Sequence, residues 1–150
     1  MDYGFSEEQE MFRKSARGFL EKECPRSLVR EIDEGKGDYS RELYRKMAGL
    51  GWLGLMIPEE YGGVGGNWID MAIFHEEAGR ALLQSPYLST VVTCGQAILA
   101  LGTEEQRRFF LPKIASGEVV MALALAEPEA LIVKPMRPPY ETFRGTQGRN

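Results

Sequence analysis

Signals that begin α-helices recur along most of this sequence. Ser6 is followed three residues later by Gln9, and Thr103 by Gln106. This is the spacing of a capping box, in which the side chain of the first residue and the backbone of the fourth satisfy each other's hydrogen bonds at a helix start. Ser40 can cap a further helix in the same way. The pattern restricts residues 6–117 to helices joined by short breaks.

Apolar residues between these starts recur at helical spacing. Phe12, Ala16, Phe19 and Leu20 form one such stripe, which the Cys24-Pro25 pair ends. Residues 88–101 predict a largely buried helix, and the helix that begins after Thr103 is expected to be interrupted at Pro112. Asn67 can cap a helix with Asp70 at its third position. In all, the patterns predict about six helices.

The texture of the sequence changes after residue 118. Val119 to Ala126 is a short, continuous apolar run, which favours a strand over a seventh helix. A single strand has unpaired N–H and C=O groups on both edges, so it implies a missing sheet or a missing subunit. The predicted fold class is therefore all-α: a helical bundle of about six helices followed by one short β-strand and an irregular tail.

The last twenty residues differ in charge from the rest. The chain has 18 basic and 22 acidic residues, a net charge of −4. Residues 131–150 contain four basic residues and one acidic residue, a net of +3, so the first 130 residues carry −7. The main part of the chain is thus acidic, which excludes the basic surface of a nucleic-acid-binding protein. The proline-rich, basic segment 131–150 is expected to be a separate tail.

Side chains that could perform catalysis or bind a metal are sparse. His75 is the only histidine, and it lies in the helix that starts at Asn67, where a structural role is expected. Glu76 and Glu77 are adjacent, so they point about 100° apart on a helix, which favours one buried and one solvated carboxylate over paired acid–base chemistry. No metal-ligand spacing is present. We predict no catalytic residue and no metal site.

The glycine-rich stretch 62–66 could be mistaken for a phosphate-binding loop. It lacks the lysine of that motif and follows no clear strand, so a tight turn with positive φ angles is expected. Cys24 and Cys94 are expected to be free thiols of a reducing compartment. The N-terminus shows no secretory signal and no apolar run is long enough to cross a membrane, which together predict a cytoplasmic location.

Four segments, in order, resemble the acyl-CoA dehydrogenase family of flavoproteins. They are residues 5–9 (FSEEQ), 50–65 (LGWLGLMIPEEYGGVG), 102–118 (GTEEQ through LP to GE) and 122–130 (ALALAEPEA). The second is similar to the family's LGxxGLxxPEEYGGxG turn and the fourth to its ALALTEPEAGSD strand. The resemblance covers residues 5–130.

The resemblance implies an enzyme of three parts: an N-terminal helical domain, a middle β-domain and a C-terminal bundle. FAD binds between the last two, and a glutamate removes the α-proton of a fatty acyl-CoA while the β-hydride goes to the flavin. The implied domains here are 1–118, the helical domain; 119–130, the first strand of a truncated β-domain; and 131–150, the unrelated tail. No residue matches the catalytic glutamate.

What remains of the implied FAD site is the predicted strand. Leu123, Leu125 and Ala126 match positions that approach the flavin ring in the family, and helix 88–101 would help to wall the acyl-chain cavity. Ala126 replaces the motif's threonine, and Leu131-Ile132-Val133 replace its Gly-Ser-Asp. This abrupt end suggests a reading-frame change near Ala130, although a deletion or fusion would give the same pattern.

Three interpretations remain open. The first is part of an FAD-dependent acyl-CoA dehydrogenase of fatty-acid metabolism, inactive by itself, with acyl-CoA as the substrate of the complete enzyme. The second is a helical interaction module that docks on a full-length relative, as a homo- or hetero-oligomer. The third is a non-functional remnant, whose exposed apolar surface would make it aggregate. None of them involves nucleic acid or a membrane span.

Overall fold

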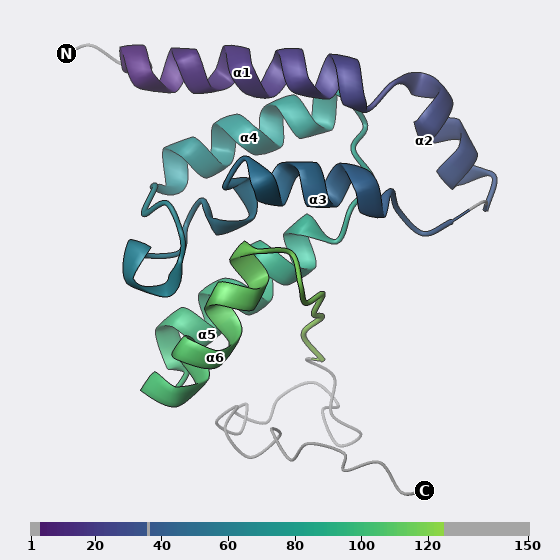
Figure 1. Cartoon of the computed structure of the whole chain (residues 1–150). Coiled ribbons are helices and arrows are strands. Elements are labelled where there is room, and N and C mark those ends of the chain that lie inside the picture. The colour runs from purple at the N-terminus through teal and green to yellow at the C-terminus, as the bar shows by residue number, and fades with distance from the viewer. Residues whose placement is uncertain (1–3, 36, 125–150) are drawn as a thin grey trace, which may run out of the picture.

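The computed structural model describes residues 4–35 and 37–124 and is shown in Figure 1. The six α-helices in this part of the chain are α1 (Glu7–Glu23), α2 (Arg26–Asp33), α3 (Arg41–Gly49), α4 (Trp68–Arg80), α5 (Gln96–Leu101) and α6 (Glu104–Ala115). Two 3₁₀ turns, η1 (Trp52–Gly54) and η2 (Glu59–Tyr61), join α3 to α4, and the π-helix η3 (Leu88–Gly95) runs into α5. The helical bundle predicted from the sequence is confirmed.

The helices begin where the sequence predicts. The Ser6 side chain accepts a hydrogen bond from the Gln9 amide, and the Thr103 side chain accepts one from the Gln106 amide. In return, each glutamine side-chain oxygen accepts a hydrogen bond from the backbone N–H of its cap residue. Asn67 completes a third capping box at the start of α4. Each cap satisfies amides that would otherwise have no partner in the first turn.

Two predictions about the C-terminal elements are wrong. Residues 119–124 form no strand, because nothing in the described part of the chain offers them a neighbouring strand; 125–130, the rest of the predicted strand, lie outside the described residues. Pro112 does not interrupt α6, which continues to Ala115. Pro112 has no N–H to donate, but the hydrogen bonds continue past it, since the Ser116 amide donates to the Pro112 carbonyl oxygen at 2.9 Å.

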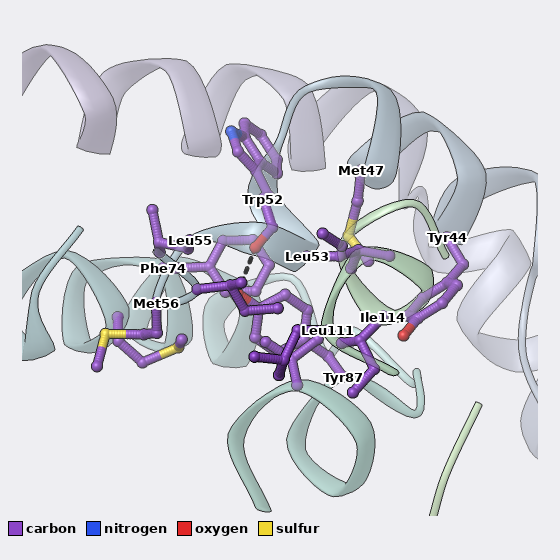
Figure 2. Close-up of a cluster of buried hydrophobic side chains, with 14 of the residues drawn as sticks. Tyr44, Met47, Trp52, Leu53, Leu55, Met56, Phe74, Tyr87, Leu111 and Ile114 are labelled. Carbon is purple, nitrogen blue, oxygen red and sulfur yellow. Dashed lines mark hydrogen bonds between the residues drawn. The ribbon is translucent and has the colours of Figure 1, made fainter. Parts of the chain in front are cut away.

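The core is built around the segment between α3 and α4. Trp52 is 6% exposed, and its ring makes edge contacts with Phe19 of α1 and Phe74 of α4, at centroid distances of 4.9 and 5.6 Å. Tyr87 stacks on Phe74, and its hydroxyl donates a hydrogen bond of 2.7 Å to the Trp52 carbonyl oxygen (Figure 2). The 3₁₀ turn η1 thus links α1, α4 and the start of η3.

The glycine-rich stretch after this segment is the tight turn that the sequence predicts. Gly62 and Gly65 have φ angles of +80° and +69°, which residues with a Cβ atom rarely adopt. A Cβ atom at Gly63 would lie 1.9 Å from the Ile57 carbonyl oxygen, so the two backbone stretches meet where only glycine fits.

Candidate functional site

The candidate site is an apolar cavity of about 110 Å³ between α5, α6 and the segment that follows α6. Cys94, Ala97, Leu101, Phe110 and Leu123 are among its lining residues. Gln106 contributes an amide, and none of the described residues that line the cavity is charged. Such a surface is chemically suited to a hydrocarbon group.

One wall of the cavity continues into η3. This element is a π-helix, in which hydrogen bonds run to the fifth preceding residue, a pattern that is rare and is often found at functional sites. Thr90, in the middle of η3, is fully buried. Its Oγ1 donates to the Met121 carbonyl oxygen at 3.0 Å and accepts from the Met121 amide at 2.9 Å. Thr90 therefore holds the chain as it leaves α6 and passes along the cavity.

The structure places one of the three residues expected to contact the flavin. Leu123 lies at the edge of the cavity and is 41% exposed. Leu125 and Ala126 lie outside the described residues, so flavin contact by this segment stays a prediction. The lining residues fit the edge of an apolar ring or an acyl chain, and they include no charged group that would hold a diphosphate. They could account for only a small part of an FAD site.

The cysteines are free thiols, as predicted, and both are buried. Burial raises the pKa of the Cys94 thiol, which keeps it protonated and makes it a poor nucleophile. In the cavity Cys94 thus acts as one more apolar group.

The other candidate residues make structural contacts. His75 Nδ1 lies 2.9 Å from the Met71 carbonyl oxygen, and the ring rests edge-on against Tyr87. Glu77 is buried at 2% exposure, whereas the side chain of Glu76 is 49% exposed. The described residues contain no group of three histidine, cysteine or acidic side chains that could hold a metal ion.

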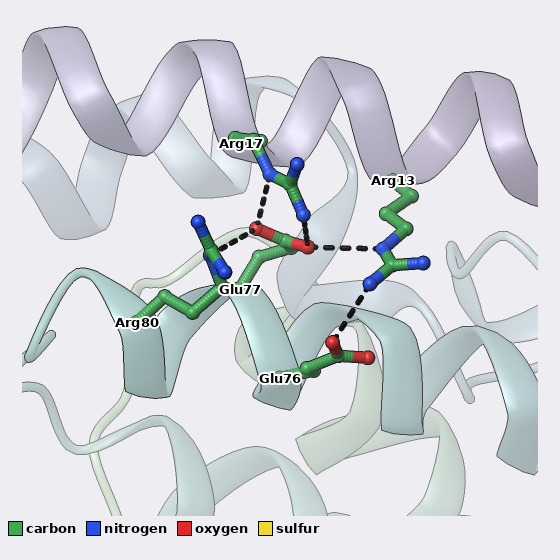
Figure 3. A network of polar contacts seen from close by, with 5 residues as sticks. All are labelled: Arg13, Arg17, Glu76, Glu77 and Arg80. Carbon is green, nitrogen blue, oxygen red and sulfur yellow. Dashed lines mark hydrogen bonds and ion pairs between the residues drawn. The ribbon is translucent and has the colours of Figure 1, made fainter.

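The buried carboxylate of Glu77 lies between α1 and α4 (Figure 3). It accepts hydrogen bonds from Arg17 Nε and Nη2 at 2.9 and 2.7 Å, and from Arg13 Nε at 3.1 Å. Arg17, and then Arg13, hold the pKa of Glu77 below its usual range against the opposing effect of burial. The ion pairs join the two helices and favour the ionised form of Glu77.

Sequence reasoning missed Thr90 and the arginine partners of Glu77. A threonine within a largely apolar helix pattern gives no sign that its partner lies 31 residues away. The pairing of Glu76 with Glu77 did indicate one buried carboxylate, but not which arginines would approach it. Among the described residues, no helix is long and apolar enough to cross a membrane.

The bundle and its cavity define a helical domain with one apolar, hollowed surface. Residues 6–118 match the family model of the acyl-CoA dehydrogenase N-terminal domain. The chain therefore belongs to the acyl-CoA dehydrogenase family and corresponds to its N-terminal domain.

Individual relatives agree with this assignment. The chain is 40% identical over 128 residues to the CarC subunit of the caffeyl-CoA reductase–Etf complex of Acetobacterium woodii, covering 84% of this chain and 34% of the relative. It is 34% identical over 132 residues to the short-chain specific acyl-CoA dehydrogenase of Clostridium acetobutylicum, covering 87% and 34%. A structure of glutaryl-coenzyme A dehydrogenase with glutaryl-CoA matches with a TM-score of 0.74, at 32% identity, over 87% of this chain and 34% of that one.

The chain spans about a third of the length of these relatives. Members of the family are FAD enzymes, and the first of these relatives is itself a subunit of a complex with a partner protein.

Proposed function

We propose that this chain is the helical domain of an FAD-dependent enzyme that oxidises acyl-CoA thioesters between Cα and Cβ. In this proposal residues 1–118 form the helical domain, 119–130 enter the β-domain, and 131–150 are a separate tail. The observation that supports it is the uncharged apolar cavity along η3 and α5, beside the segment that the family resemblance assigns to the flavin site. The domain forms the wall for the acyl chain and is inactive by itself.

In this proposal the chain's own residues exclude water from the acyl chain and position the backbone segment that follows α6. The alkyl and aromatic side chains of Ala97, Leu101 and Phe110 shield an acyl chain from solvent. Thr90 fixes the backbone at Met121, two residues before Leu123. When bound, FAD would accept the hydride, and the base that removes the α-proton would come from outside the described residues.

A domain exchange tests this function. Residues 5–124 would replace the matching domain of the Clostridium acetobutylicum enzyme, and dye-coupled activity would be measured with acyl-CoAs of increasing length. Ala97→Phe should fill the cavity and lower kcat/KM about tenfold or more for the substrates whose chains reach it. Ala100→Phe is the matched control, because Ala100 is exposed on the same helix and does not line the cavity.

Equal activity of the two phenylalanine variants on every chain length would overturn the cavity assignment. The unmodified 150-residue chain, assayed with FAD and butyryl-CoA, should show no turnover. Turnover by the chain alone would contradict the assignment of the base to another part of the enzyme.

A partner protein is the second part of the proposal. Large apolar side chains are exposed on η3, α5 and α6, at Leu88 (60%), Leu101 (68%) and Phe109 (55%), and Leu101 also lines the cavity. Exposed apolar groups of this kind favour burial against another protein surface. We propose that they pack against the remainder of a dehydrogenase, either in the same polypeptide or in a related chain. Light scattering of the purified chain, alone and mixed with the domain-deleted Clostridium enzyme, tests this: a mixture with no complex would contradict it.

A further inference from the structure

A second cavity, of about 250 Å³, is lined by residues of α1, α2 and α4. It is formed where α1 ends, α2 begins and α4 ends. Arg17, Arg26 and Arg80 line it together with two carboxylates, Glu21 and Glu77. Three guanidinium groups from three different helices are thus brought to one concave surface.

The charge of Glu77 is already balanced within the network of Figure 3. Its two oxygens take the short hydrogen bonds from Arg17 and Arg13, and the pKa of the carboxyl group is lowered accordingly. Arg80 is left with a longer contact of 3.5 Å from its Nε to Glu77, and its side chain is 59% exposed. Since one Nε serves that contact, the other donors of Arg80 are available to a ligand.

Arg26 is available in the same way. It is the first residue of α2, it is exposed, and it makes no ion pair or hydrogen bond through its side chain to any described residue. The first turn of α2 contains no acidic residue, and its N-cap Pro25 provides no side-chain hydrogen bond. The positive end of that helix therefore adds to the charge of the arginines.

We propose that this cavity binds a phosphate group, either as free phosphate or as the monoester of a small metabolite. Arginine donors in a fork match the oxygens of phosphate, and an anion gains from the guanidinium groups of Arg26 and Arg80, which the ion pairs of Glu77 leave available. Leu20 and Ala81 line the same cavity and offer an apolar surface to the carbon part of an ester. The site is separate from the α5–α6 cavity and does not depend on the proposed dehydrogenase function.

Amide chemical shifts of the ¹⁵N-labelled full chain, titrated with inorganic phosphate at constant ionic strength, test the proposal. Saturable shifts are expected at residues 24, 26–28 and 80–82. Arg26→Gln and Arg80→Gln should each weaken the affinity about fivefold or more, because each removes a charge-assisted contact. Arg45→Gln is the matched control: it removes the same charge from an exposed position on α3 that does not line the cavity.

No saturation with phosphate, or an equal loss of affinity in Arg45→Gln, would overturn the proposal. A parallel titration with glycerol phosphate separates the two sources. If glycerol phosphate binds more tightly than inorganic phosphate, the ligand is a phosphate ester. If it binds equally or more weakly, the ligand is the free ion. Circular dichroism melts of the variants check that each remains folded, which is expected because both substituted side chains reach solvent.

Discussion

Arg17 of α1 and Glu77 of α4, which are 60 residues apart in the sequence, form a bidentate ion pair. Arg17 Nε lies 2.9 Å from Glu77 Oε2, and Nη2 lies 2.7 Å from Oε1. The guanidinium side reaches solvent, with 38% of the Arg17 side chain exposed, while the Glu77 side chain is 1% exposed. The cost of burying the carboxylate is thus offset at the boundary between two helices, which fixes how α1 lies on α4.

Replacing Glu77 by glutamine should lower the free energy of unfolding by about 1–3 kcal/mol, because Arg13 and Arg17 lose their charged partner. Urea unfolding followed by circular dichroism measures the change. Glu76→Gln removes the same charge from a half-exposed side chain and should change stability by less than about 0.5 kcal/mol. Equal effects of the two substitutions would show that the burial of Glu77 is not what matters.

The same ion pair predicts how stability depends on pH. The pKa of Glu77 is lowered in the folded protein from its ordinary value of 4.5. A lowered carboxyl pKa stabilises the fold above that ordinary value, and the stabilisation is lost as the pH falls through the folded pKa. The difference in unfolding free energy between the wild type and Glu77→Gln should therefore be constant above about pH 5 and shrink below pH 4.5. Glu23, whose pKa Lys46 also lowers, is present in both proteins and cancels. A difference that stays constant down to pH 3 would contradict the prediction.

What the sequence predicted well is what neighbouring residues determine. The caps at Ser6, Asn67 and Thr103 involve groups no more than three residues apart, so the helix starts follow from the sequence alone. The turn at Gly62 and Gly65 is local in the same sense.

What the sequence left open depends on distant contacts. The π-helix η3 and an α-helix both bury one face, so an apolar pattern of helical period is compatible with either. The pattern therefore does not show which hydrogen-bond spacing the segment adopts. The apolar run after residue 118 fits a strand by composition, but residues 119–124 have no regular secondary structure and no strand partner in the described part of the chain. The cavity wall depends on Thr90 and Met121, which only the tertiary fold brings together.

Gly63→Ala should be the most damaging of the glycine substitutions in the turn. Its Cβ would lie 1.9 Å from the Ile57 carbonyl oxygen and 2.4 Å from the carbonyl carbon, so the backbone must move. We expect a loss of about 2 kcal/mol or more in thermal or urea unfolding. Gly18→Ala is the control, because Gly18 lies in the middle of α1 on its exposed face, with nothing within 4 Å of the new Cβ. This substitution should stabilise the protein by about 0.5–1 kcal/mol, since alanine favours the helix more than glycine does. If Gly63→Ala were as stable as the wild type, the close approach of the two backbones would be wrong.

Thr90→Val should release the segment after α6 without creating a cavity. Valine has nearly the shape of threonine but makes neither hydrogen bond to Met121, so a backbone N–H and C=O lose their partner. We expect the Met121 amide to exchange with solvent at least about tenfold faster and global stability to fall by about 1–2 kcal/mol. Thr93→Val is the control on the same π-helix, since the Thr93 hydroxyl bonds to the Leu88 carbonyl oxygen and not to Met121. Hydrogen exchange measured by NMR separates the two: if the Met121 amide keeps its protection in Thr90→Val, then Thr90 does not hold this segment, and the wall of the α5–α6 cavity must be fixed by packing of Met121 and Ala122 alone.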